Sequence, residues 1–167
     1  MTTSENLPQF RSYGHDLSLI KDERLIAFHA YWMSIHNGDA LPSRKQLDPL
    51  QFPMGLLGYI SLLDVSADGK GGYRLTYRLA GSVSYDHGVF FRKISGSEPH
   101  EILPPGEAEA IVRDWTQAIV TRRPMGAIGV SLPFKCGPMP WEAIALPLSS
   151  DGSTVDVLLT ARVPLNQ

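Results

Sequence analysis

The sequence has little of what marks disulfide-stapled, nucleic-acid-binding or membrane proteins. Cys136 is its only cysteine, so an internal disulfide is impossible. Its 15 basic and 17 acidic residues leave a net charge of −2, which argues against a nucleic-acid or anionic-membrane partner. The longest apolar run, Met54 to Leu63, is about half as long as a membrane-spanning helix. Because residues 1–20 are polar and do not resemble a signal peptide, these absences together predict a cytoplasmic protein.

What remains is an ordinary globular composition. The 167 residues are 43% hydrophobic and 19% charged, which is enough apolar material for one sizeable core. We expect a flexible N-terminal arm over residues 1–21, a helix and connector over residues 22–57, and one main domain over residues 58–165.

A broad apolar stripe predicts the N-terminal helix. Asp22 is a suitable N-cap, and Gly38 follows the predicted end of the helix near Asn37. The stripe consists of Leu25, Phe28, Trp32 and Ile35, widened by Ile26, His29 and Met33. Because this stripe is too broad for one face of a sheet to cover, we expect the helix to contribute to a homodimer contact. Pro42 and Pro49 make the connector that follows stiff.

Two kinds of periodicity predict the main domain. A second helix is predicted over residues 106–122, where apolar residues recur every three or four positions. Short apolar or alternating runs predict five strands, over residues 58–65, 73–80, 125–134, 141–148 and 155–163. In the clearest strand the alternating residues, expected on one face, are Tyr73, Leu75, Tyr77 and Leu79. The expected class is therefore α+β, an antiparallel sheet with helices gathered on one face.

Four charged residues are predicted to stabilise the fold. The expected internal ion-pair network, which would tie the connector to the sheet, consists of Arg44, Asp48, Arg78 and Glu142. For Arg78 the alternative is a binding site for a ligand carboxylate. No metal site is expected, because His29 and His36 are seven positions apart on one helix.

A catalytic role is not expected. Asp86 and His87 are the best acid–base candidates, since a carboxylate can orient an imidazole. Adjacent residues seldom face each other, however, and no nucleophile is paired with them in the sequence. Cys136 lies in a Gly-Pro turn and is expected to be an incidental thiol. A small α+β cavity enzyme that uses Asp86 or His87 remains as an alternative.

Three blocks of sequence carry a family resemblance. The first contains Tyr31-Trp32, Leu41-Pro42-Ser43-Arg44, Leu47-Asp48-Pro49, Leu56-Leu57 and Leu63-Asp64-Val65. The second is Tyr77-Arg78-Leu79-Ala80-Gly81-Ser82. The third contains Trp141-Glu142, Leu146-Pro147-Leu148-Ser149-Ser150-Asp151-Gly152 and Val155-Asp156-Val157-Leu158-Leu159. As a set, spanning about residues 22–163, these blocks resemble a family of bacterial, mostly alphaproteobacterial, stand-alone PAS-domain proteins.

The resemblance implies a PAS-like sheet of five antiparallel strands in the order 2-1-5-4-3, with an extra N-terminal helix. It also implies a sensory or regulatory role in signal transduction, through a small ligand, a partner protein or a dimer contact. A flavin-reactive cysteine context is not visible, and His87 or His100 would have to supply the axial ligand of a haem, so the cofactor is left open. A dimerisation module without a ligand is a further alternative.

A PAS-like arrangement places a ligand cavity between the inner face of the sheet and the second helix. Alternation points Tyr77 inward, and Trp115 lies on the apolar face of the helix. Tyr85, His87 and Phe90 belong to an irregular segment that is expected to roof the cavity. Such a pocket, of about 300 Å³ or more, would suit a small, mostly apolar ligand with one or two hydrogen-bonding groups. The alternative is that the same aromatic rings fill a packed core.

Overall fold

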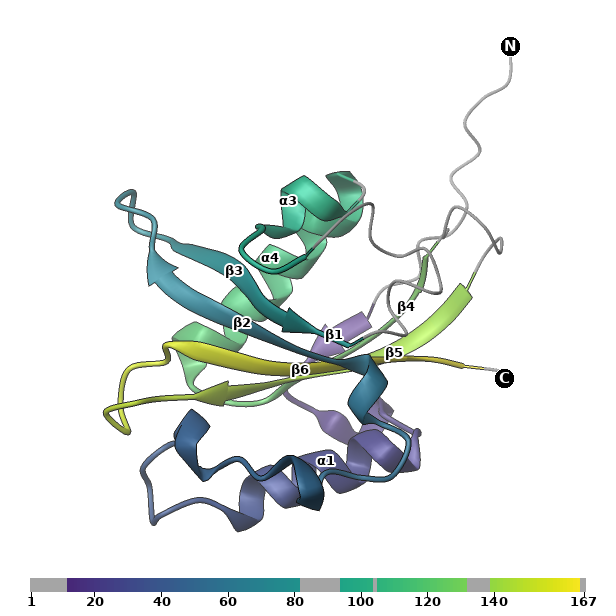
Figure 1. Cartoon of the computed structure of the whole chain (residues 1–167). Helices are drawn as coiled ribbons and strands as arrows, with labels where there is room; N and C mark the ends of the chain where they lie inside the picture. Colours follow the sequence, from purple (N-terminus) through teal and green to yellow (C-terminus); the bar gives the residue numbers. More distant parts are fainter. Residues whose placement is uncertain (1–11, 82–93, 104, 132–138, 166–167) are drawn as a thin grey trace.

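The computed structural model describes residues 12–81, 94–103, 105–131 and 139–165 (Figure 1). At its centre is a six-stranded antiparallel sheet in the order β1-β4-β5-β6-β2-β3. The strands are β1 (Ser12–Gly14), β2 (Ile60–Ala67), β3 (Tyr73–Ala80), β4 (Met125–Ser131), β5 (Met139–Leu148) and β6 (Val157–Pro164). Strands β2 to β6 correspond to the five predicted strands, and their arrangement confirms the predicted order 2-1-5-4-3.

Helices cover both faces of the sheet. Figure 1 shows α3 (Pro99–Ile102) and α4 (Pro105–Thr121) on one side, and α1 (Glu23–Ser34) with the connector on the other. Strand β5 contacts both helical layers, because successive side chains of a strand point to opposite faces of the sheet. Trp141 and Ala143 face α4, whereas Glu142 contacts the backbone at the start of α1. The extra N-terminal helix thus lies opposite the two PAS helices, and β5 is buried on both sides.

The described part of the N-terminal arm is docked, which differs from the expected flexible arm. Strand β1 pairs with β4, with Tyr13 opposite Ala127. The ring nitrogen Nδ1 of His15 lies 2.8 Å from the carbonyl oxygen of Pro124. Ile20 is buried, and a Cβ atom on Gly126 would lie 3.2 Å from its side chain. The sequence does not predict strand β1, because three residues of strand are too few to show a periodicity.

Helix α1 begins where the sequence predicts. The Asp22 side chain caps it by accepting hydrogen bonds from the backbone N–H groups of Arg24 and Leu25. Leu25, Phe28 and Trp32 are buried, so the centre of the predicted stripe packs on the sheet. The Trp32 indole Nε1 also donates a hydrogen bond to the carbonyl oxygen of Pro147, at 3.0 Å. These contacts hold the helix directly against β5.

The predicted ion-pair network is wrong. Arg78 pairs with Asp64 instead, at 2.8 Å between Nη2 and Oδ1. Asp48 caps its own short 3₁₀ turn by accepting a hydrogen bond from the backbone N–H of Leu50. Glu142 accepts only backbone N–H groups, and Arg44 pairs with no acidic residue in the part of the chain that the structure describes. Asp48 is satisfied by its own local cap and Arg78 by a cross-strand neighbour, while Glu142 is satisfied by backbone groups that are distant in sequence.

A β-bulge changes the face of β3 halfway along it. Leu62 pairs with Leu79 and Leu63 pairs with Tyr77, so Arg78 is an extra residue on β3. Tyr77 therefore faces the inner side of the sheet, while Leu79 is turned to the outer side and is 52% exposed. The sequence prediction that Tyr77 and Leu79 share one face is wrong, because it assumed an uninterrupted alternation.

Candidate functional site

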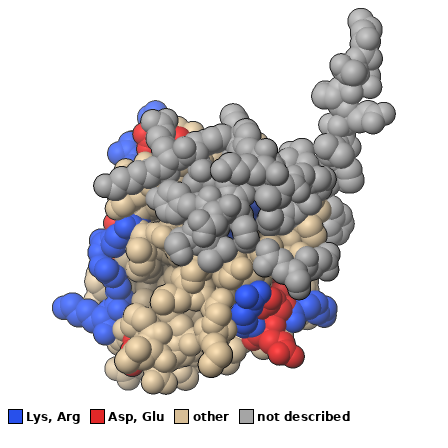
Figure 2. Space-filling model, turned by 45° about the vertical axis from the view of Figure 1, so that its right-hand side comes forward, with Lys and Arg blue, Asp and Glu red and all other residues tan. Residues whose placement is uncertain are grey.

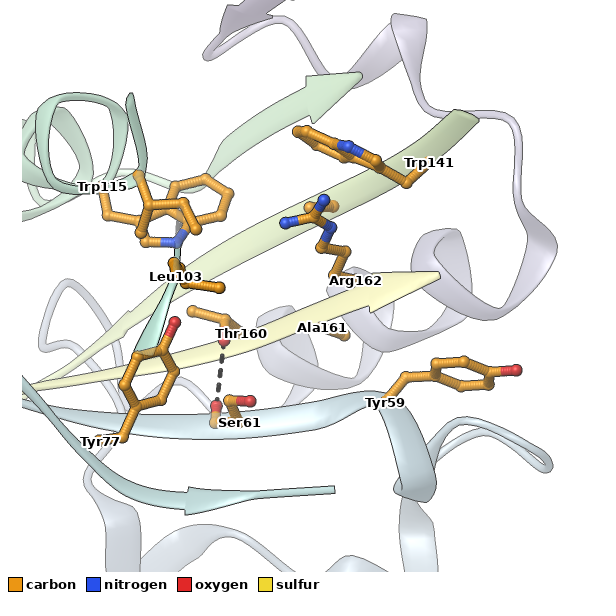
Figure 3. A pocket seen from close by; sticks show the side chains of 11 residues that line it. Tyr59, Ser61, Tyr77, Leu103, Trp115, Trp141, Thr160, Ala161 and Arg162 are labelled. Atoms are coloured by element: carbon orange, nitrogen blue, oxygen red, sulfur yellow. Dashed lines mark hydrogen bonds between the residues drawn. The ribbon is translucent and has the colours of Figure 1, made fainter. Parts of the chain in front are cut away.

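A small cavity lies between the inner face of the sheet and α4. Its volume is about 40 Å³. Its walls come from four strands and two helical segments that are distant in sequence (Figure 3). The lining residues are Tyr59, Ser61, Tyr77, Leu103, Ile111, Trp115, Trp141, Ala143, Thr160, Ala161 and Arg162. A volume of this size has room for a few water molecules, since one water needs roughly 10–15 Å³.

Tyr77 and Trp115, two of the five residues that the sequence suggested for a ligand site, line one end of this cavity. Trp115 is carried on the apolar face of α4 together with Ile111. In Figure 3 the Tyr77 hydroxyl points toward Leu103 and Trp115. Burial raises the pKa of the Tyr77 phenol above its ordinary value of 10.0, because the charged form would lose its water. Tyr77 is therefore a neutral phenol that can donate or accept a hydrogen bond.

Arg162 places a positive charge in the cavity wall. Its guanidinium carbon lies 4.2 Å from the centre of the Trp141 ring, within the range of a cation–π contact. Its Nη2 atom is 3.7 Å from Oε1 of Glu107, at the start of α4. Figure 3 shows the guanidinium beside the Trp141 ring, at the opposite end of the cavity from Tyr77. The described wall thus has a neutral phenol at one end and a cation at the other.

Hydroxyl groups lie along the floor between these ends. The Thr160 hydroxyl donates a hydrogen bond to the carbonyl oxygen of Ser61, at 3.2 Å (Figure 3). This bond crosses from β6 to β2, where Thr160 and Ser61 are paired residues. The floor therefore combines polar atoms with the apolar surfaces of Ala161 and Ala143. A few polar groups in a mostly apolar wall are typical of ligand pockets.

Sequence reasoning found part of this site. Tyr77 and Trp115 line the cavity, whereas Tyr85, His87 and Phe90 lie outside the described residues, as do Asp86 and Cys136. The cavity is also smaller than the roughly 300 Å³ expected for a ligand pocket. His100, one of the two candidate haem ligands, is exposed on α3 beside Glu98 and is not part of the lining.

Arg162 and Thr160 were missed, although a signal was present. In β6 the alternating apolar residues are Val157, Leu159, Ala161 and Val163, which leaves Leu158, Thr160 and Arg162 on the other face. Because both faces of this strand are covered, residues on either face can line a buried space. Since α1 covers the face with the alternating apolar residues, alternation assigns Arg162 to the face of the sheet that carries α4.

The sequence places this chain in a family. A family model described as a PAS domain matches residues 20–159. The match includes α1, α4 and the sheet from β2 to the start of β6. The chain therefore belongs to the PAS domain family, which is a family of sensory domains.

Several solved structures match the chain at low sequence identity. A variant of RsLOV has 15% sequence identity and a TM-score of 0.48, and the match covers 68% of this chain and 63% of that chain. A fungal LOV-domain photoreceptor has 17% identity and a TM-score of 0.48, with 82% and 89% covered. An RNA-binding Light-Oxygen-Voltage receptor has 13% identity and a TM-score of 0.48, with 93% and 38% covered. The chain thus spans less than two thirds of the first and third of these structures.

Three further searches found no match or feature of the kind sought. No curated protein matches the chain in sequence. Among the residues that the structure describes, no three His, Cys, Asp or Glu side chains are grouped as metal ligands would be. None of the described helices has the length and apolar character needed to cross a membrane.

Proposed function

We propose that this chain is a sensory or regulatory PAS domain that binds a small ligand in the Tyr77–Arg162 cavity and passes its state to a partner protein. The observation that carries the proposal is the cavity wall, in which Tyr77 and Arg162 stand at opposite ends of a mostly apolar space. Family membership supports the sensory role. The bacterial origin implied by the resemblance and the cytoplasmic location predicted from composition are part of the same proposal.

The wall suits a compact ligand with an apolar body and one acceptor group. The Trp115 ring and Leu103 offer apolar surface, and Tyr77 offers a neutral hydroxyl. Arg162 favours a carbonyl or carboxylate oxygen on the ligand, because hydrogen bonds to a charged donor are stronger than neutral ones. Tyr85, His87 and Phe90 remain the predicted roof of this site.

Mass spectrometry of the purified chain tests the ligand. The native mass should exceed the denatured mass by that of a retained small molecule, and an absorption spectrum will identify a coloured cofactor. Tyr77→Phe, which removes only the hydroxyl, should reduce retention. Tyr73→Phe is the matched control, because Tyr73 lies on the same strand but is partly exposed and outside the lining. Equal retention in both variants would contradict the assigned site.

The second part of the proposal is a homodimer formed through α1. Its buried face packs on the sheet, while Ile26 and Met33 on the other side are 51% and 55% exposed. These two residues are seven positions apart, so they lie on one face of the helix. In Figure 2 the middle of the lower surface carries mostly uncharged side chains, with charged groups on its left and right. An apolar face of this kind is typical of an interface between subunits.

Light scattering at high protein concentration tests the dimer. Met33→Glu should shift the protein to monomer, because a charge would be buried without a partner. Val120→Glu is the control, since Val120 is equally exposed but lies on α4. A monomeric wild type, or equal dissociation in both variants, would remove this part of the proposal.

A dimerisation module without a ligand is the second candidate function. The small volume of the cavity, about 40 Å³, favours it over a binding domain for a large cofactor. Native mass separates the two, because a module without a ligand would give a dimer of unmodified chains. The enzyme alternative depends on Asp86 and His87, which lie outside the described residues.

A further inference from the structure

A second, larger hollow lies on the opposite face of the sheet from the cavity. This outer groove has a volume of about 640 Å³, which is within the usual range for small-molecule sites. Its floor is formed by Leu62 and Leu159, which are paired residues of β2 and β6. Leu159 is in turn paired with Leu146, on the face of β5 that also carries Glu142 and contacts α1. The outer groove is therefore separated from the inner cavity by the full thickness of the sheet.

Two backbone features shape one side of the groove. The β-bulge at Arg78 turns Leu79 out of the inner face and into the groove wall. At one end, Gly58 and Gly81 approach so closely that a Cβ atom on Gly81 would lie 2.0 Å from the Gly58 carbonyl oxygen. Bulges and glycine contacts of this kind re-aim side chains at defined places. The backbone of β2 and β3 therefore fixes the shape of this side of the outer groove.

The connector forms the other wall and is fixed to α1. The Gln46 amide Nε2 donates a hydrogen bond to the carbonyl oxygen of Ile35, at 2.8 Å. The Tyr31 hydroxyl accepts one from the backbone N–H of Asp48, also at 2.8 Å. Phe52, which lines the groove, packs edge-on against the Phe28 ring at 5.3 Å between centroids. A wall held in this way requires little ordering when a ligand binds.

The described lining of the outer groove is apolar apart from one basic side chain. Arg44 is the single charged residue among the lining side chains that the structure describes, and every other lining residue is apolar or glycine. Two acidic residues, one on the connector and one on β2, have other partners. Asp48 accepts the Leu50 N–H group, and Asp64 pairs with Arg78. Among the residues that the structure describes, the groove thus offers an apolar surface and one guanidinium without an acidic partner, and these complement a ligand with an apolar chain and an anionic head.

We propose that the outer groove binds a medium-chain monocarboxylate, a fatty-acid-like amphiphile, with its carboxylate on Arg44. The alkyl chain lies over Leu62, Leu79 and Leu159, where its transfer from water supplies most of the affinity. The Arg44 guanidinium donates hydrogen bonds to both carboxylate oxygens and fixes the direction of the chain. This site is independent of the inner cavity and goes beyond the function proposed for it.

Titration calorimetry of the full chain with sodium dodecanoate, kept below its micelle concentration, tests the proposal. Dodecanoate should bind one molecule per chain. Decanoate should bind about tenfold more weakly, because two buried methylene groups are lost. Dodecanol, with the same chain but no charge, should bind about fivefold more weakly, as expected for an exposed ion pair.

Three variants locate the ligand. Arg44→Gln should weaken dodecanoate about fivefold and leave dodecanol unchanged. Lys45→Gln is the matched control, because Lys45 is exposed on the same 3₁₀ turn but does not line the groove. Leu79→Gln should weaken both ligands by more than tenfold, and its far-ultraviolet circular dichroism will verify that the fold is intact.

Three results would overturn the proposal. The first is no binding of dodecanoate at any concentration below its micelle concentration. The second is binding that is lost in Trp115→Leu but kept in Leu79→Gln, which would place the ligand in the inner cavity. The third is a groove occupied by a second copy of this chain. Leu50 and Met54 of the connector are 90% and 96% exposed and could insert into the groove of that copy. A dimer that Leu79→Gln dissociates and dodecanoate does not affect would assign the groove to that copy.

Discussion

Both carboxylate oxygens of Glu142 lie 3.0 Å from the backbone nitrogen of Lys21, which is 121 positions away in the sequence. The Oε2 atom also accepts a hydrogen bond from the backbone N–H of Asp22, at 2.8 Å. Glu142 is buried, and the next residue toward the N-terminus, Trp141, faces the cavity and stacks on Arg162. Strand β5 therefore contacts the cavity with one side chain and the start of α1 with its neighbour.

Glu142→Ala should loosen the start of α1. The substitution leaves two backbone N–H groups at the sheet without their acceptor, which destabilises by about 1–3 kcal/mol. Hydrogen exchange by mass spectrometry should show faster exchange in peptides that cover Lys21 to Leu25, with β6 unchanged. Glu109→Ala, at an exposed position of α4, is the control. Uniformly faster exchange in every peptide would show that Glu142 stabilises the whole domain and not this helix.

Trp32 should be the most sensitive position of α1. Trp32→Ala removes a buried ring and should lower the free energy of unfolding by roughly 3–5 kcal/mol. Trp32→Phe keeps most of the ring but loses the hydrogen bond to Pro147, so a loss of about 1 kcal/mol is expected. At protein concentrations low enough for the monomer, Met33→Ala, on the exposed side, should change stability by less than about 0.5 kcal/mol. Urea unfolding measures all three, and an equal loss for Trp32→Ala and Met33→Ala would contradict the packing of α1 on the sheet.

The cap of α1 should make stability depend on acid pH. The Arg24 side chain hydrogen-bonds Asp22 and, with the backbone N–H groups of the first turn, lowers the pKa of that carboxyl below its ordinary value of 3.8. A lowered pKa stabilises the folded state above the unfolded value, and this stability is lost as the pH falls through the folded pKa.

Asp22→Asn isolates this effect, because Asn is also a good N-cap but does not titrate. At pH 7 the wild type should be more stable than Asp22→Asn by roughly 0.3–1 kcal/mol, the usual range for a charge at a helix end. The difference should shrink progressively below pH 3.8. Urea unfolding at several pH values measures it, and a difference that does not change with pH would contradict the assigned cause.

Two glycines should respond in opposite ways to alanine. Gly81→Ala would place a Cβ atom 2.0 Å from the Gly58 carbonyl oxygen, so the ends of β2 and β3 must separate and several kcal/mol of stability should be lost. Gly106 in α4 has no atom within 4 Å of a Cβ position. Gly106→Ala should be neutral or stabilise by up to about 1 kcal/mol, because alanine favours the helix. Thermal unfolding compares the two, and similar melting temperatures would be inconsistent with the close backbone contact.

The helices and the five strands were predictable from local patterns, whereas the order of the strands in the sheet was predictable only from the family resemblance. Alternation in β3 and the apolar runs of β5 and β6 have the period of strands, and the stripe that includes Leu25 and Trp32 has the period of a helix. The bulge at Arg78 was not predictable, because an extra residue leaves no mark in a pattern that still alternates. Strand β1 was missed for a similar reason, since three residues cannot establish a period.

The site was only half predictable. Tyr77 and Trp115 were found because large aromatic residues on apolar faces are expected to point to the interior. Arg162 was missed because a charged residue in a strand is normally assigned to solvent, and its contact with Trp141 exists only after folding. Glu142 was identified as a structural residue but given the wrong partners, since backbone N–H groups are absent from any pattern of side chains.

The extra residue in β3 has an evolutionary consequence. Loss of the codon for Arg78 would remove the bulge and leave both flanking pairs as they are, with Tyr77 opposite Leu63 and Leu79 opposite Leu62. Leu79 would stay in the wall of the outer groove and Tyr77 in the wall of the inner cavity, because neighbouring residues of a regular strand face opposite sides. Loss of any single residue from the paired part of β3 other than Arg78 would instead leave the bulge and shift the pairing of one end of the strand. Among related chains, this strand should therefore occur with and without the extra residue while the faces of the positions matching Tyr77 and Leu79 are kept.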